Sequence, residues 1–144
     1  MPKPNDDISF RLRFRMDRLR QRTWLAVPTS IGSIATLDLV PNSVATRSVI
    51  TPIAYHKLRD LELIDLDIHD LQSGRVTSVL GNVSIAGLSA PDLAVQIRDV
   101  PELLGSDGRF LVDGYLGLDY LFFGDFGSIE INTRTLRVTL RPDR

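Results

Sequence analysis

The sequence LVPNSVATRSVITP, residues 39–52, places a polar turn between two short apolar runs. The second run, Ser48 to Ile50, is followed by Thr51 and Pro52, which are well suited to cap a helix and to begin it. The segment therefore predicts a strand, a tight turn that carries Asn42 near its tip, a second strand and a short helix.

Short strands dominate the rest of the pattern. Residues 8–16, ISFRLRFRM, alternate strictly between apolar side chains and arginines, which is typical of one half-buried strand. Residues 61–68 and 76–80 alternate in the same way around a turn at 70–74, which predicts a hairpin. The other expected elements are strands at 24–28, 34–40, 83–85 and 93–97, a turn at 31–33, a helix at 53–58, a helical turn at 101–105 and a final hairpin over 129–140. This content predicts an all-β barrel or sandwich.

Composition excludes several classes of protein. A chain of 144 residues suits one domain, and the lack of cysteine excludes disulfides, thiol catalysis and cysteine-ligated metal. The formal net charge of -1 gives no overall attraction to nucleic acid, so we do not expect a nucleic-acid partner. No apolar run approaches the roughly 18 residues of a spanning helix, and the polar start does not resemble a secretory signal. We therefore expect a cytoplasmic protein without a membrane partner.

Charge is distributed unevenly along the chain. Residues 11–22 contain six arginines, whereas residues 59–70 are rich in aspartate and glutamate. The two segments could be separate solvated faces, or they could neutralise each other within one molecule or between two. A third alternative is that the arginine strand binds an anionic partner, which would make its affinity strongly dependent on salt.

A second motif completes a pattern with the first. LVDGYLGLDYL, residues 111–121, precedes the IEINTRTLRVTL hairpin at 129–140. From about Trp24 to Leu140 the chain resembles the retropepsin-like aspartic proteases, the single-lobe relatives of pepsin. In that family an Asp-Thr/Ser-Gly-Ala turn precedes a Val-Ile-Ser-Pro stretch and a short helix, and a Leu-Leu-Gly-Leu-Asp-Phe-Leu stretch follows later. Residues 48–52 and 115–121 are similar to these two stretches, and the hairpin at 61–80 occupies the place of the family's flap.

The resemblance implies an all-β fold, a retropepsin-like closed barrel with one or two short helices. It also implies a division into an N-terminal arginine-rich strand segment, residues 1–22, and a retropepsin-like domain, residues 23–144, within a single domain overall. The terminal strands, ISFRLRFR and TLRVTLRP, are expected to join in an interface sheet, because the family builds its central groove from two copies.

The chain departs from the family where the chemistry takes place. In the family, two such turns meet across a dimer, and their aspartates share a proton and hold the attacking water. Here Asn42, Ser43 and Val44 stand at that turn. An amide has no oxygen basic enough to accept the proton, and Val44 crowds a position where glycine allows close approach. The resemblance thus implies a degenerate site with no intact catalytic residue.

Other side chains could carry the chemistry instead. Asp38, Asp113 and Asp119 are the carboxylates nearest to the two motifs, but each is expected to be structural. His56 and His69 are the only histidines, and they are expected at the surface: Asp67 and Asp70 flank His69, but flanking neighbours on a strand point different ways. We therefore expect no metal and no cofactor.

The sequence supports two hypotheses for function. The first is a pseudo-protease, a catalytically inactive homodimeric module that binds or assembles other chains, with an extended peptide in the groove beneath the 61–80 hairpin. The residues expected to contact the peptide are Gln72, Ser73, Gly74 and Tyr115. The alternative is an active aspartic endopeptidase with an atypical or misaligned catalytic motif.

Overall fold

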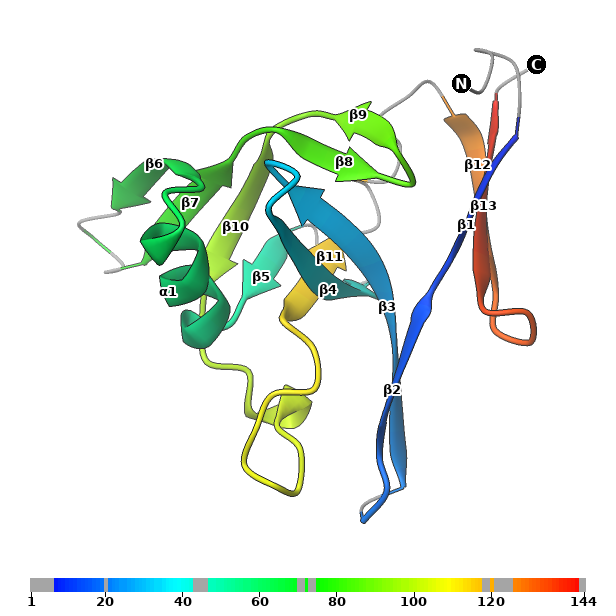
Figure 1. Ribbon diagram of the computed structural model, residues 1–144, viewed down its shortest axis with the longest axis horizontal. Helices are drawn as coiled ribbons and strands as arrows, with labels where there is room; N and C mark the ends of the chain where they lie inside the picture. Colours follow the sequence, from blue (N-terminus) through cyan, green and yellow to red (C-terminus); the bar gives the residue numbers. More distant parts are fainter. Residues whose placement is uncertain are drawn as a thin grey trace.

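A computed structural model describes residues 7–19, 21–42, 47–69, 72, 75–117, 120 and 126–142. Short strands make up most of this part of the chain (Figure 1). The strands are β1 (Ile8–Arg11), β2 (Arg13–Asp17), β3 (Arg22–Ile31), β4 (Ala35–Asn42), β5 (Ser48–Ile50), β6 (Ile64–His69), β7 (Val76–Leu80), β8 (Val83–Ile85), β9 (Leu88–Ala90), β10 (Leu93–Ile97), β11 (Gly114–Gly117), β12 (Phe126–Asn132) and β13 (Arg137–Pro142). One α-helix, α1 (Pro52–Asp60), and one 3-10 turn, η1 (Pro101–Leu103), accompany them.

The strands form two sheets. The larger sheet has the order β6-β7-β10-β5-β11-β4-β3-β8-β9, with β2 paired to β3 outside this path. The smaller sheet has the order β1-β13-β12 and stands beside the larger one (Figure 1). The prediction of an all-β fold with one or two short helices is confirmed. The prediction of a closed barrel is not confirmed. Within the described ranges no pairing joins β6 to β9, so the larger sheet is open there.

The centre of the larger sheet has an inserted strand. β4 and β5 follow each other in the chain, yet β11 lies between them, parallel to β4 and antiparallel to β5. A Cβ atom on Gly114 would lie 1.9 Å from the carbonyl oxygen of Val49, so only glycine allows β11 to approach β5 this closely. The two ladders together fix the position of β11, which would otherwise be a short and weak strand.

The helix forms where its local signals predict it. The Thr51 hydroxyl accepts a hydrogen bond of 3.1 Å from the backbone N–H of Ala54, and Pro52 is the first helical residue. Ala54 and Leu58 are buried and attach the helix to the core. Within the described part of the chain, no helix is long and apolar enough to cross a membrane.

The first expected strand is two strands in the structure. β1 pairs with β13, whereas β2 pairs with β3, and Leu12 lies between them. Leu12 is buried, and its N–H donates a 2.6 Å hydrogen bond to the carbonyl oxygen of Leu136. The prediction of one continuous strand over residues 8–16 was therefore wrong, because the chain changes partner sheet at Leu12 while the alternation of its side chains continues.

Apolar side chains cover both faces of the central strands. The larger cluster includes Leu37, Leu39, Ile50 and Leu116, and it extends to Leu140 of the terminal sheet. The smaller cluster lies on the other face and consists of Ala26, Val49, Val100, Leu103 and Val112. The centre of the larger sheet is thus buried on two sides, which holds the ends of β4 and β11 in fixed positions.

Replacement of Gly114 with alanine tests the insertion of β11. The new Cβ would meet backbone atoms of β5, which cannot move aside as a side chain can, so we expect the free energy of unfolding to fall by about 3 kcal/mol. Urea denaturation measures this loss. The matched control is Gly87→Ala, where nothing lies within 4 Å and only the φ of +77° is unfavourable, at a cost of about 1 kcal/mol. Equal losses in the two variants would contradict the close approach.

Candidate functional site

Asn42 ends β4 and lies beside β11. It is half-buried, and its register partner in the parallel ladder is Gly117. The two sequence motifs, which are more than seventy positions apart, therefore meet in space at this point. Ser43 and Val44, the other two residues of the expected degenerate turn, lie outside the described residues.

Hydrogen bonds hold the strand ends around Asn42. The N–H of Gly117 donates to the Ser48 hydroxyl at 3.1 Å, which connects β11 to the start of β5. Further back along the same strands, the N–H of Asp113 donates to the carbonyl oxygen of Asp38, and the N–H of Asp38 donates to the Asp113 carboxylate, both at 2.8 Å. These bonds fix β11 against its neighbours at both ends.

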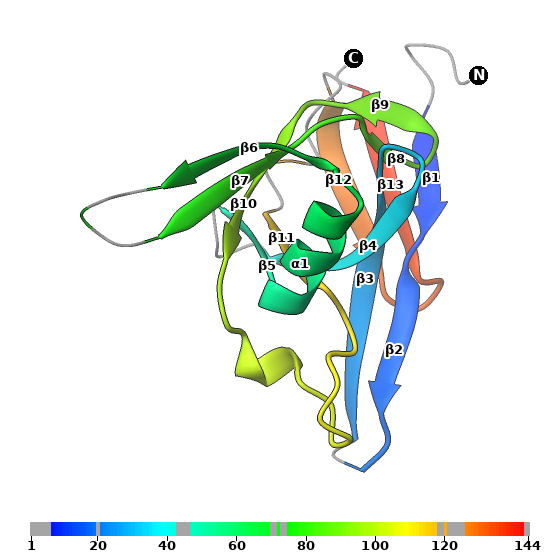
Figure 2. The ribbon, with the colours of Figure 1, turned by 60° about the vertical axis from the view of Figure 1, so that its left-hand side comes forward.

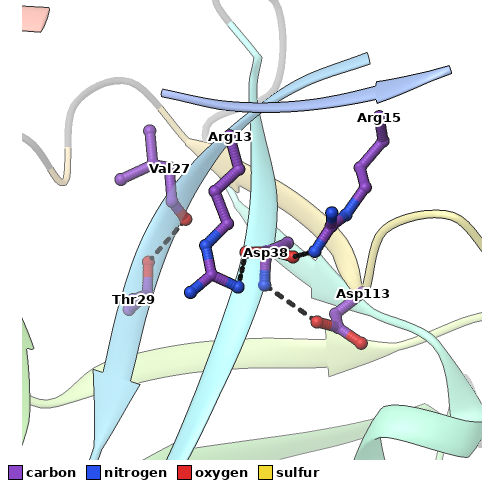
Figure 3. Close-up of polar contacts among 6 residues, drawn as sticks. All are labelled: Arg13, Arg15, Val27, Thr29, Asp38 and Asp113. Carbon is purple, nitrogen blue, oxygen red and sulfur yellow. Dashed lines mark hydrogen bonds and ion pairs between the residues drawn. The ribbon is translucent and has the colours of Figure 1, made fainter. Parts of the chain in front are cut away.

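Asp38 is a buried carboxylate held by two arginines (Figure 3). Arg15 donates to its Oδ2 atom at 3.1 Å, and a guanidinium nitrogen of Arg13 lies 3.5 Å from Oδ1. Both arginines come from β2 and reach across β3. Because Asp38 is four residues before Asn42, it lies about 13 Å further along the strand and could not hold a water molecule at the position of Asn42. Its charge is used to attach β2 to the sheet.

Asp113 is half-buried beside Asp38. Loss of hydration raises the pKa of the Asp113 carboxyl, and the negative charge of Asp38 raises it further. The hydrogen bond from the Asp38 N–H acts in the opposite direction. Asp113 therefore joins β4 to β11 rather than facing the end of β4. Asp119, the third alternative carboxylate, lies outside the described residues.

The expected hairpin is formed by β6 and β7 and is fixed at its base. The hydroxyl of Tyr55 in α1 donates to Asp67 of β6 at 2.9 Å, and the Ser78 hydroxyl of β7 donates to the same carboxylate. The bond from Ser78 is the largest cause of a lowered pKa at Asp67. Gln72 is exposed near the tip. The other two expected contact residues there, Ser73 and Gly74, lie outside the described residues.

A cleft of about 490 Å³ opens between this hairpin, β10 and the start of β5. Its lining includes Arg47, Ile68 and Thr77, together with Gln96 and Tyr120. Burial raises the pKa of Tyr120 to about 12, and its hydroxyl donates to the carbonyl oxygen of Pro91. Sequence reasoning missed these residues. The only signal in the sequence was that several of them lie within or next to the two motifs and the hairpin.

Tyr115 lies away from that cleft. It packs against the smaller apolar cluster, and its hydroxyl donates to Glu102 at 3.3 Å. Burial, with the charge of Glu102, raises the pKa of Tyr115. The structure thus places Tyr115 next to Val40 and Val49 in the sheet but does not bring it together with Gln72.

The histidines suggest no metal centre. Both His56 and His69 are exposed, and the ring of His56 lies edge-on to that of Tyr55 at a centroid distance of 5.5 Å. In the part of the chain that the structure describes, no group of three acidic or histidine side chains is arranged to hold a metal ion.

Comparison with a solved structure identifies the fold. The crystal structure of a retropepsin-like aspartic protease from Rickettsia conorii superposes with a TM-score of 0.55 over 96% of each chain, at 13% sequence identity. The chain has the retropepsin-like fold. The retroviral protease-like domain of Ddi1 from Leishmania major gives a TM-score of 0.46 at 18% identity, over 83% of this chain and 94% of that domain. No protein-family model and no curated protein matches the sequence.

The pH dependence of stability tests the buried position of Asp113. Since its folded pKa lies above the usual 3.8, its contribution to stability decreases as the pH rises from 3.8 through the raised folded value. Asp113→Asn removes this titratable group, so the stability of the natural protein relative to the variant should fall as the pH rises from about 4 towards neutrality. Thermal unfolding across that range measures it, with the exposed Asp99→Asn as the control for net charge. A difference that is constant or rises with pH would contradict the assignment.

Proposed function

We propose that this protein is a catalytically inactive, homodimeric retropepsin-like module that binds an extended peptide. The position of Asn42, at the end of β4 and paired in register with Gly117, is the observation that supports this function. In the retropepsin-like proteases that the sequence resembles, an aspartate occupies the corresponding turn. In this chain the side chain at that position, Asn42, is a neutral amide.

The reaction requires a group that the amide lacks. Hydrolysis by a pair of aspartates needs one ionised carboxylate to take a proton from the attacking water. An asparagine oxygen accepts hydrogen bonds but does not accept a proton near neutral pH. Asn42 can therefore maintain the hydrogen bonds of the turn and hold a polar ligand, but it cannot activate water.

The neighbouring carboxylates are poor substitutes for the missing aspartate. Asp38 is paired with Arg13 and Arg15, and the Asp113 carboxylate accepts a hydrogen bond from the backbone N–H of Asp38. Both carboxylates are thus engaged in contacts that lie away from the end of β4. This arrangement favours the inactive module over the alternative, an active endopeptidase with an atypical catalytic motif.

The cleft beside the β6–β7 hairpin is suited to an extended chain. It combines apolar surface from Ile68 with polar groups from Thr77 and Gln96, and it contains one charge of each sign, from Arg47 and Asp92. Ile68 is 51% exposed, so an apolar side chain of a ligand could cover it. Such a mixture binds main-chain groups and alternate side chains of a peptide without any cleavage step.

The terminal sheet supports a dimer. β1, β13 and β12 pair within one chain, and among the described residues no further strand pairs with the two outer strands, so a second copy could extend either edge. Ile131 of β12 is 37% exposed beside a groove of about 300 Å³ that also contains Leu25 and Pro41. This groove adjoins Asn42 in the chain, so a partner that covers it would bring a second copy of the site nearby.

A peptidase assay tests the loss of catalysis. At mildly acidic pH the natural protein should show no pepstatin-sensitive cleavage of a mixed peptide library. The double variant Asn42→Asp, Val44→Gly supplies both missing features and should gain inhibitor-sensitive cleavage. Pepstatin-sensitive cleavage by the natural protein that disappears on changing Asn42, Asp38 or Asp119 would overturn the proposal.

Sedimentation equilibrium tests the dimer separately. The natural protein should sediment at twice the mass of one chain. Ile131→Lys places a charge at the proposed interface and should weaken the association about tenfold or more, because an unpaired buried charge is costly. Ile34→Lys, at a turn residue that is 66% exposed, is the matched control and should remain dimeric. A monomer at all accessible concentrations would refute the dimer, but it would not argue for an active enzyme.

A further inference from the structure

The outer strand β2 has one unpaired edge. It pairs with β3 from Arg13 to Asp17, and among the described residues no strand pairs with its other side. β1 and β2 follow each other along one side of the molecule (Figure 2). An unpaired edge presents a row of backbone N–H and C=O groups, which can pair with a further strand.

The two faces of β2 carry different chemistry. Arg13 and Arg15 lie on the face that also carries Asp38, and their side chains are 48% and 43% exposed. Phe14 and Met16 lie on the other face and are 47% and 45% exposed. Since successive side chains of a strand point to opposite faces, a strand added to this edge would meet arginines on one face and apolar groups on the other.

Positive charge is in excess along this edge. A cleft of about 470 Å³ is lined by Arg11, Arg13 and Arg15 together with apolar groups that include Phe14. The carboxylate of Asp38 is shared between two of these arginines. Arg11 lies directly opposite Arg137 in the β1–β13 ladder, and like charges at opposite positions repel. A negatively charged ligand at this edge would relieve that repulsion.

We propose that the free edge of β2 binds an extended segment of another protein in which acidic residues alternate with apolar residues. The backbone of the segment pairs with β2, its carboxylates meet Arg13 and Arg15, and its apolar side chains cover Phe14 and Met16. The cleft next to Arg11 receives a further carboxylate. This surface is separate from the cleft beside the β6–β7 hairpin.

Two other occupants of this edge are less suitable. The β2 edge of a second copy would place arginines opposite arginines, which repel. The chain's own acidic segment, residues 59–70, contains β6, which is at one end of the order of the larger sheet, and its Asp67 is bound by Tyr55 and Ser78. No ion pair joins residues 11–19 or 21–22 to residues 59–69 in the structure.

Titration with a designed peptide tests the proposal. The probe is a capped eight-residue peptide in which glutamate alternates with valine. The only tryptophan of the chain, Trp24, is the direct cross-strand partner of Arg15, so its fluorescence should change on binding. Two control peptides define the mode of binding: one with lysine in place of glutamate, and one with alternate backbone amides methylated, which cannot pair as a strand. Neither control should bind.

Substitutions on the protein locate the surface. Arg11→Gln together with Arg13→Gln leaves the stronger bond from Arg15 to Asp38 intact, and it should weaken binding of the glutamate peptide about fivefold. Arg98→Gln removes an exposed arginine outside this cleft and should leave the affinity unchanged. Absence of binding, equal binding of either control peptide, or an unchanged affinity of the double variant would each overturn the proposal.

Discussion

The insertion of β11 between β4 and β5 is the constraint on which the rest of the structure depends. Two ladders, the close approach of Gly114 to Val49 and the paired bonds between Asp38 and Asp113 fix this strand on both sides. The strand is only four residues long, and it would have little stability without these contacts. Because β11 is fixed, Gly117 and Asn42 are brought side by side.

The proposed loss of catalysis would leave this arrangement intact. The contacts that stabilise the centre of the sheet involve glycines, a hydroxyl and carboxylates away from the end of β4. None of them needs a charge at position 42. A neutral amide there costs the fold little, whereas catalysis by paired aspartates depends entirely on that charge. Under the proposed function, the residues that stabilise these strands differ from the residue whose replacement removes catalysis.

Local signals in the sequence predicted the parts of the fold that are local. The α1 helix followed from Thr51 and Pro52, and the hairpin of β6 and β7 followed from alternation around a turn. The break at Leu12 could not be predicted, since the alternation continues while the pairing partner changes. The bond between Arg15 and Asp38 was equally hidden, because it joins residues 23 positions apart on strands separated by β3. The proximity of Asn42 and Gly117 came only from the resemblance between whole motifs.

A single cysteine at position 42 tests the central claim most directly, because the natural chain contains no cysteine. If two copies of this residue face each other across a two-fold axis, Asn42→Cys should form an intermolecular disulfide rapidly under mild oxidation, since such a bond requires Cα atoms only about 4–7 Å apart. Ser89→Cys, at an exposed position on β9, should not. A stable dimer in which cysteine 42 fails to cross-link would show that the two sites do not meet, and that the account of a shared central groove is wrong.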